Sequence, residues 1–284
     1  MRIDIKVLYF VSVFLILFVI LSGCKSAEPK IVSDESKADS YYQLGLAALN
    51  QGEYVRAKRE ITRAIETAPD IPHYYNHLGI VYFQENDYKK AEEMYRKALE
   101  LDERYSDAYN NLGALHIKTG DYEKAIEYFD IVSEDPLYPY PHYVQANLGI
   151  VKRLQKKYDE AEKHLLNSIR LKGTHCEAYK ELAILYDEQS LHEKAAKNYD
   201  STIKFCPYHV EALYRGAVKA YMLKKESVGE KYLKRCLEVD FTNVKRIQIP
   251  FLDDCVDLAN QVGVTYSPEK EGSRGGEKRQ IDAN

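Results

Sequence analysis

Five cysteines are the residues of this chain whose types and spacing best allow covalent chemistry. Two of them, Cys176 and Cys206, stand at the start and at the end of one predicted helix pair. Antiparallel packing brings those two ends to the same edge, so a disulfide between them is geometrically possible. Cys236 could pair with Cys255 on the last predicted helix. Buried free thiols, which pack as small apolar groups, are the alternative, so the sequence leaves the pairing open.

Two histidines, His73 and His77, lie at i and i+4 in the stretch HYYNH, which is the spacing that zinc-binding helices use. Tyr74 stands where zinc peptidases carry a glutamate, and no third ligand suggests itself. The sequence also contains no phosphate-binding loop, no GxSxG elbow and no CxxC pair. We therefore predict no metal, no cofactor and no catalytic residue, and we interpret the two histidines as polar side chains on the groove side of a helix.

Internal repeats explain how these residues are positioned. Equivalent stretches begin at Ala38, Pro72, Ser106, His142, Cys176 and Val210. Their starts recur at an interval of about 34 residues, which is the period of the tetratricopeptide repeat. Only the interval between the third and fourth starts is slightly longer. A small residue recurs at the place where paired helices cross: Ala57, Ala91, Ala125, Ala161, Ala195 and Gly229.

One helix pair cannot bury its apolar face alone, so stacked pairs must share a continuous core. The sequence therefore predicts an all-α tetratricopeptide-repeat superhelical solenoid of six helix pairs plus a C-terminal capping helix.

The period also gives the expected boundaries. Six repeats fill residues 38–241, as 38–71, 72–105, 106–141, 142–175, 176–209 and 210–241. The apolar helical pattern after Pro250 predicts a capping helix within residues 242–266, because solenoid ends require a cap with a polar outer face. Residues 267–284 are glycine-rich, charged and nearly free of apolar side chains, which predicts a disordered tail.

An apolar run of fifteen residues, Val7 to Leu21, follows two basic residues near the N-terminus. A membrane-spanning helix needs about 20 apolar residues. The apolar region of a secretion signal has about 7–15 residues. The length of the run and the positive charge before it therefore predict a signal peptide over residues 1–23.

The apolar run ends in LSGC, residues 21–24, which resembles the bacterial lipobox. This resemblance implies cleavage before Cys24, lipidation of Cys24, and a polar, flexible tether over residues 24–37. An uncleaved anchor with an incidental cysteine is the alternative. In the sorting rule of many Gram-negative lipoproteins, Asp after the cysteine retains the protein at the inner membrane. Lys25 stands there, which implies an outer-membrane protein that faces the periplasm.

Composition agrees with an exported body. The net charge is -4, far from the strongly basic balance of a typical nucleic-acid binder, and no second apolar run has spanning length. We therefore predict membrane attachment through the lipid on Cys24 and no nucleic-acid partner. An oxidising compartment would also permit disulfides among the four remaining cysteines, which are even in number.

The first helix of each repeat is expected to line a concave groove. The ninth place of the repeat is apolar in all six repeats, and the twelfth place is apolar in the first three. A hydrophobic partner segment, such as a helix laid into the groove, fits these rows. The alternative is that the side chains fill a tight superhelix and meet no partner. The predicted partner-binding residues are Tyr42, Leu46, Leu49, Ile80, Phe83 and Ile117.

The lipobox, the short tether and the six repeats together resemble the tetratricopeptide lipoproteins of type IV pilus biogenesis, the pilotins of the pilus secretin. The resemblance covers nearly the whole mature chain and includes the enlargement EDPLYPYPHYVQANLG, residues 134–149. It implies a non-enzymatic protein that binds secretin subunits in the periplasm and promotes their outer-membrane localisation and multimer assembly.

Two alternatives from other classes remain. One is a general scaffold lipoprotein that recruits cell-wall hydrolases or envelope-assembly factors through the same groove. The other is an enzyme with a site in the groove, against which the lack of convergent titratable residues argues.

Overall fold

The computed structural model describes residues 34–238 and 251–264, which form thirteen helices and no strand. The first helices of the repeats are α2 (Asp34–Asn50), α4 (Pro72–Gln84), α6 (Ser106–Thr119), α8 (Pro141–Leu154), α10 (Cys176–Glu188) and α12 (Val210–Met222). The second helices are α3 (Tyr54–Thr67), α5 (Tyr88–Leu101), α7 (Tyr122–Ser133), α9 (Tyr158–Leu171), α11 (His192–Phe205) and α13 (Glu226–Leu237). The terminal helix is α14 (Leu252–Val262).

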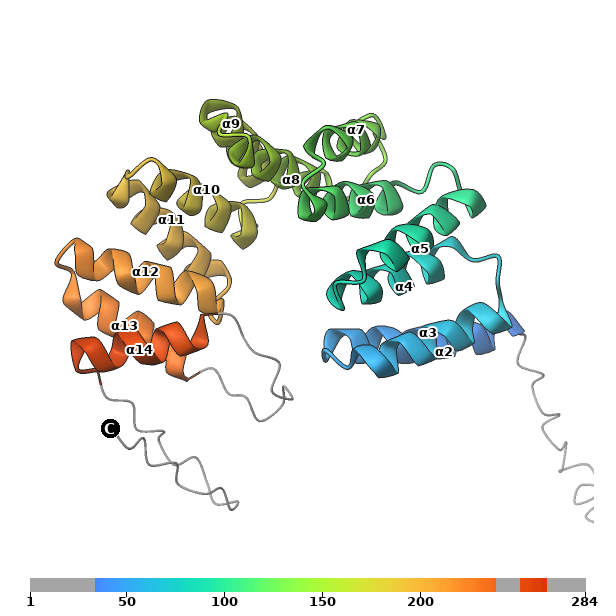
Figure 1. Ribbon diagram of the computed structural model, residues 1–284, viewed down its shortest axis with the longest axis horizontal. Coiled ribbons are helices and arrows are strands. Elements are labelled where there is room, and N and C mark those ends of the chain that lie inside the picture. Colours follow the sequence, from blue (N-terminus) through green and yellow to red (C-terminus); the bar gives the residue numbers. More distant parts are fainter. Residues whose placement is uncertain (1–33, 239–250, 265–284) are drawn as a thin grey trace, which may run out of the picture.

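Each first helix packs against the second helix of its own repeat, and successive pairs stack into an open arch (Figure 1). The arch has two ends, one formed by the N-terminal pair α2 and α3 and the other by the C-terminal helices α13 and α14. The arrangement confirms the predicted all-α superhelical solenoid of six helix pairs followed by a terminal helix.

Small residues at the helix crossings set the distance within each pair. A Cβ atom added to Gly79 would lie 2.5 Å from Cε1 of Tyr95, and one added to Gly113 would lie 2.5 Å from Cε1 of Phe129. Tyr95 and Phe129 are only 1% and 0% exposed, so neither ring can move aside without disturbing the core. In the first four pairs, a glycine of the first helix thus makes room for a large side chain of the second helix.

The turn inside each repeat contains one residue in the left-handed backbone region, with φ between 57° and 82°. These residues are Gly52, Asn86, Gly120, Lys156, Ser190 and Lys224. Their spacing repeats the period of the sequence, including the enlargement between the third and fourth repeats. Only glycine adopts this conformation without steric cost, so the last three turns hold backbone strain that the first three largely avoid.

The terminal helix α14 lies within the predicted capping region and packs against α12 and α13. Cys255 and Ala259 are buried in this contact, and the ring of Phe251 stacks on Tyr214 with centroids 5.9 Å apart. Three exposed aspartates lie on the outer side of the helix. The apolar inner side and the polar outer side suit the end of a solenoid.

The predicted signal peptide, Cys24, most of the tether and the C-terminal tail lie outside the described residues, as does the first part of the predicted capping region. Among the residues that the structure describes, no helix is both long enough and apolar enough to span a membrane. Lipidation and the outer-membrane location therefore stay predictions.

Candidate protein-interaction site

The first helices form the inner layer of the arch. Each of the helices α2, α4, α6 and α8 contacts the first helix of the next repeat. In Figure 1, α6 and α8 lie on the inside of the arch, and α7 and α9 lie on its outside. Side chains of the first helices that point away from their second helices therefore face the concave side, where the predicted groove residues lie.

Five of the six predicted groove residues are partly exposed. Each packs against the buried core of its repeat and keeps a minor part of its surface exposed. The five are Leu46, Leu49, Ile80, Phe83 and Ile117. Apolar side chains held in this way by the core form a rigid apolar lining over the first three repeats, which is the kind of surface a partner can cover without reordering it. We call these five residues the N-terminal apolar rows.

Tyr42, the sixth predicted groove residue, is buried in the contact between α2 and α4 and is only 7% exposed. Its hydroxyl lies 3.0 Å from Nδ1 of His77, and its ring centroid lies 4.8 Å from that of Tyr74 and 4.9 Å from that of His73. Burial, and then the neighbouring phenol of Tyr74, raise the pKa of Tyr42 to about 12. Tyr42 therefore supports the groove wall from behind and offers a partner almost no surface.

The two histidines at i and i+4 belong to the same contact. Nδ1 of His77 lies 2.9 Å from the carbonyl oxygen of His73, besides its contact with the hydroxyl of Tyr42. Burial lowers the pKa of both imidazoles. Both histidine side chains thus belong to the packing contact between the first two repeats.

Asparagines link the first helices along the inner layer in repeats two to four. The side chain of Asn111 donates to Oδ1 of Asn76 at 2.8 Å, and that of Asn147 donates to Oδ1 of Asn110 at 3.3 Å. Our sequence reasoning missed this ladder. The signal available was the recurrence of asparagine at the fifth or sixth place of three successive repeats.

Charged pairs replace the asparagines in the later repeats. Arg153 of α8 donates to Glu181 of α10 at 2.9 Å and also pairs with Glu188. The side chains of Arg153 and Glu181 are only 12% and 8% exposed. Lys219 of α12 pairs with Asp187 of α10 at 2.8 Å. The charges that the sequence places in this half of the groove are therefore paired with one another between repeats.

Lys180 and Glu177 extend this network to the N-terminal end of α10. Lys180 forms ion pairs with Glu177, Glu181 and Glu211. Burial alone would lower the pKa of Lys180, but these carboxylates raise it above its usual value. Burial likewise opposes ionisation of Glu177, but His209 and Lys180 outweigh it and lower the pKa of Glu177 to about 2.

Two disulfides lie in the C-terminal half. Cys176 is bonded to Cys206 with Cα atoms 6.0 Å apart, and Cys236 is bonded to Cys255 with Cα atoms 6.4 Å apart. The first bond ties the start of α10 to the end of α11, and the second ties the terminal helix α14 to α13. Both pairings are among those that the sequence analysis considered.

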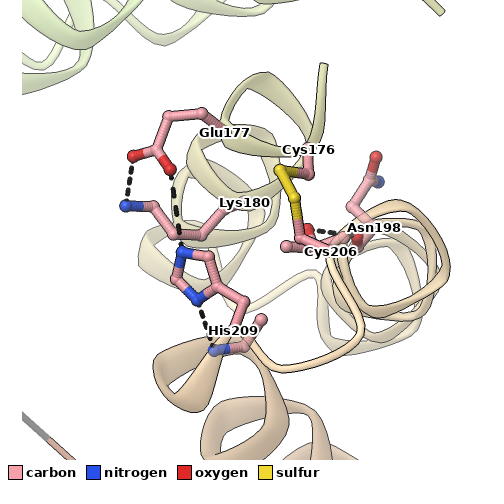
Figure 2. Close-up of a disulfide and its surroundings, with 8 residues drawn as sticks. Cys176, Glu177, Lys180, Asn198, Cys206 and His209 are labelled. Carbon is pink, nitrogen blue, oxygen red and sulfur yellow. Dashed lines mark hydrogen bonds and ion pairs between the residues drawn. A yellow bond between two sulfur atoms is a disulfide. The ribbon is translucent and has the colours of Figure 1, made fainter. Parts of the chain in front are cut away.

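The first disulfide lies beside the charged cluster of Glu177, Lys180 and His209 (Figure 2). Nε2 of His209 lies 3.7 Å from the carboxylate of Glu177, while its Nδ1 accepts from the backbone N–H of Ala212 and caps α12. The short turn between α11 and α12 is thus held to α10 at both of its ends.

In residues 34–238 and 251–264, no group of three or more His, Cys, Asp or Glu side chains is arranged to hold a metal ion. What the first helices do present is a concave surface with an apolar N-terminal part and a charged C-terminal part. That arrangement suits the binding of a protein segment.

Comparisons with known proteins agree with this architecture. Two models described as tetratricopeptide repeat match residues 42–105 and 82–148. A search of curated proteins gave no significant match. The fold is therefore the all-α tetratricopeptide-repeat superhelix, a scaffold that typically mediates protein–protein interaction.

Among solved structures, the chain is similar to PilF of Pseudomonas aeruginosa, with 26% identity and a TM-score of 0.58, covering 79% of this chain and 99% of that one. It is also similar to PilW, described as a widely conserved type IV pilus biogenesis factor, with 21% identity, a TM-score of 0.61, and coverage of 77% and 98%.

The same fold occurs in the Cut9–Hcn1 hetero-tetramer of the APC/C, with 16% identity, a TM-score of 0.63, and coverage of 78% and 42%. The chain thus has the tetratricopeptide-repeat fold and is similar to type IV pilus biogenesis factors, in a fold that other assemblies share.

Proposed function

We propose that this protein is an outer-membrane-anchored periplasmic lipoprotein that binds subunits of the type IV pilus secretin. In this role it promotes the localisation of the secretin to the outer membrane and its assembly into multimers. It acts as a binding protein and not as an enzyme. The likeness to PilF along almost its whole length supports this role, as does the lipobox-like stretch that precedes the described residues.

One observation carries the proposal. The N-terminal apolar rows lie on the first helices of the first three repeats and are held in place by the core behind them. An apolar surface that is exposed on a monomer is a liability unless a partner covers it. A secretin subunit that has not yet met its neighbours would expose apolar surface of its own, and the groove would cover that surface until neighbouring subunits bury it.

The lipid anchor makes weak groove binding effective. A lipid on Cys24 would confine the groove to the periplasmic surface of the outer membrane. Anything bound there is held at a high effective concentration close to its site of insertion. Assembly would then be promoted by placement and by protection of apolar surface, with no chemical step.

Phe83 is the first groove residue to test. Phe83→Ala should weaken binding of the secretin subunit by about 1–3 kcal/mol if this ring is a hot spot. The measurement is a titration of purified protein with secretin subunits, next to a thermal melt of both proteins. Val55→Ala is the matched control, because Val55 is 76% exposed on α3 and lies outside the inner layer.

An equal loss of thermal stability and binding in the Phe83 variant would instead assign this ring to the core.

The test of the whole role is a gel of outer membranes with and without this protein, probed for heat- and detergent-resistant secretin multimers. Loss of multimers while secretin monomer is still made would support the proposal. Unchanged multimers would contradict it and favour a general scaffold that recruits cell-wall hydrolases or envelope-assembly factors.

A further inference from the structure

The segment that joins α7 to α8 holds apolar side chains out toward solvent. Leu137 is 86% exposed, more than any other large apolar side chain of the described residues, and Tyr140 and Tyr143 are 47% and 42% exposed. These residues belong to the enlargement that lengthens the chain between the third and fourth repeats, and the apolar rows of the groove do not include them. We call Leu137, Tyr140 and Tyr143 the edge patch.

Hydrogen bonds build the turn that carries Leu137. Oδ1 of Asp135 accepts from the backbone N–H of Leu137 at 2.9 Å, and Oδ2 of Asp135 accepts from the hydroxyl of Ser106 at 2.6 Å. Pro136 and Pro139 restrict the backbone on either side of this turn. The exposure of Leu137 is therefore fixed by the turn and by its attachment to the start of α6.

The two tyrosines of the edge patch are supported by buried rings. The ring centroid of Tyr143 lies 4.3 Å from that of His142 and 5.0 Å from that of His175. Both imidazoles are buried, and they contact each other with centroids 4.9 Å apart. Tyr140 lies 5.9 Å from the buried ring of Tyr138 and 6.0 Å from that of Tyr143. The patch is thus a preformed apolar surface that binding need not reorder.

The edge patch lies on the same edge of the solenoid as the start of α2. The asparagine contacts described above join equivalent places of neighbouring first helices, so these helices run parallel to one another. Their starts therefore gather along one edge, and the starts of the second helices lie along the opposite edge. The edge patch surrounds the start of α8 at Pro141, and the predicted lipid tether leads into α2 at Asp34.

The predicted tether can bring this edge to a bilayer. The chain between Cys24 and Asp34 reaches at most about 35 Å when fully extended. Packed helices lie about 8–10 Å apart, so the three steps from α2 to α8 place the edge patch within about 30 Å of the start of α2. A lipid on Cys24 would therefore allow the start of α2 and the edge patch to lie on one membrane surface.

The side chains of the edge patch suit the membrane–water interface. Tyrosine is enriched there because its ring is apolar and its hydroxyl tip is polar. Nζ of the exposed Lys172 lies 5.9 Å from the ring centroid of Tyr143, where it can attract anionic headgroups. A specific protein interface buries about 800 Å² on each partner, which three partly supported side chains do not provide. A lipid surface needs only shallow insertion of apolar side chains.

We propose that the edge patch enters the headgroup region of the membrane that holds the lipid on Cys24, so that the arch stands on this edge. The edge lies at the ends of the helices, whereas the concave side faces across their axes. The groove then opens along the membrane surface, and the N-terminal apolar rows stand beside the bilayer. This proposal rests on the lipid anchor of the proposed function and does not depend on which protein the groove binds.

The test uses tryptophan as a reporter, because the chain contains none. Lipidated mature protein carrying Tyr140→Trp is reconstituted in vesicles of phosphatidylethanolamine and phosphatidylglycerol with brominated acyl chains. Its emission should shift to the blue and be quenched by the bromine. Val55→Trp is the matched control and should show neither effect, because Val55 is 76% exposed at the start of α3, on the opposite edge.

A charge placed in the patch sharpens the test. Leu137→Glu, added to Tyr140→Trp, should lower the quenching several-fold, because a carboxylate resists entry among anionic headgroups. Leu166→Glu, at an exposed leucine of α9 on the outside of the arch, should leave the quenching unchanged. Thermal melts check that each variant is folded, and flotation of the vesicles checks that the protein is anchored.

Equal quenching of the two indoles, or quenching of neither, in protein that floats with the vesicles would overturn the edge contact and leave the anchor standing. Protein that does not float would lack the anchor, which would overturn both this proposal and the proposed function. A blue shift of Tyr140→Trp caused by secretin subunits, with none caused by vesicles, would assign the patch to a protein partner. Unchanged secretin multimers together with a quenched indole would contradict the secretin role alone and support the edge contact.

Discussion

The two halves of the arch are built from the same repeat but are held together in different ways. In the first three repeats, the inner layer is joined by asparagine hydrogen bonds and by aromatic packing around Tyr42, and no disulfide occurs among residues 34–175. In the last three repeats, buried ion pairs join the inner layer, and two disulfides tie α10 to α11 and α13 to α14. The half with the apolar rows is therefore free of cross-links, and the cross-linked half is the charged one.

The turns show the same division. The left-handed position is Gly, Asn and Gly in the first three repeats, but Lys, Ser and Lys in the last three. Each non-glycine residue there costs about 1 kcal/mol or more, although asparagine tolerates the conformation better. Because a solenoid is stabilised mainly by contacts between neighbouring units, strain in one half must be offset within that half. We infer that the ion pairs and disulfides offset it.

The largest expected effect comes from Arg153→Met. The change removes the cation that Glu181, which is 8% exposed, shares with Glu188, and it leaves Glu181 with Lys180 alone. Removing one partner of a buried pair costs about 3–5 kcal/mol. Arg63→Met in the first half is the matched control, because Arg63 pairs with Glu60 but is itself 48% exposed, so its loss should cost under about 1 kcal/mol. Urea denaturation of both variants makes the comparison, and equal losses would show that the later ion pairs are not special.

Removal of a disulfide should have the next largest effect. The two bonds join cysteines whose sequence separations are 30 and 19, for which the loss of loop-closure entropy predicts about 3–4 kcal/mol each. The double variants are Cys176→Ser with Cys206→Ser, and Cys236→Ser with Cys255→Ser. Hydrogen exchange should quicken in the last repeats and stay unchanged in residues 34–141, which serve as the internal control. Faster exchange in both halves would mean that the arch unfolds as one unit and that the division has no energetic meaning.

The largest single effect of acid should fall in the second half. The folded-state pKa of His175 is lowered from 6.5 to about 4, chiefly by burial. Between pH 6.5 and about 4, His175 therefore binds a proton in the unfolded chain but stays neutral in the folded chain. Stability contributed by the neutral histidine is fully present above pH 6.5 and is lost as the pH falls toward 4, by about 1.4 kcal/mol per pH unit. Urea midpoints at several pH values measure this slope, and His175→Gln should reduce it, while the other histidines whose pKa is lowered by burial maintain the remainder. An unchanged slope in the variant would assign the acid sensitivity to those other groups.

The sequence was sufficient for the fold because the repeat is a local pattern. The small residues at Ala57 and Ala91 meet helices of their own pair, so the repeat period identifies them without knowledge of the superhelix. It was not sufficient for contacts between repeats. Whether Tyr42 is open or buried depends on His77 and Tyr74 of the next repeat, and on the angle between the two pairs.

The same limit explains the other features that the sequence analysis left open or missed. Arg153 and Glu181 belong to different repeats, as do His142 and His175, so neither pair has a local signature. The cysteine pairing was narrowed by the predicted helix ends but needed the actual Cα separations. Contacts set by stacking geometry are therefore the part of this molecule that a repeat pattern cannot supply.

The smallest expected effect, an exchange of turn residues, tests the origin of the difference. Lys156 has φ of 60°, and Lys156→Gly should relieve a steric cost of about 1–2 kcal/mol. Glycine also makes the unfolded chain more flexible, which removes about 0.5–1 kcal/mol of that gain. The steric effect is larger, so the net expectation is a stabilisation of about 0.5–1 kcal/mol, measured as a rise in the urea midpoint.

Gly120→Ala is the reciprocal change in the first half. Gly120 has φ of 82° at the equivalent place of the preceding repeat, and a Cβ atom added there meets nothing within 4 Å. The variant therefore measures the backbone cost alone, and it should be destabilised by about 1 kcal/mol. If both changes move stability as expected, the turns account for strain that the cross-linked half must offset. If Lys156→Gly destabilises, contacts of the lysine side chain outweigh the strain, and the disulfides need another explanation.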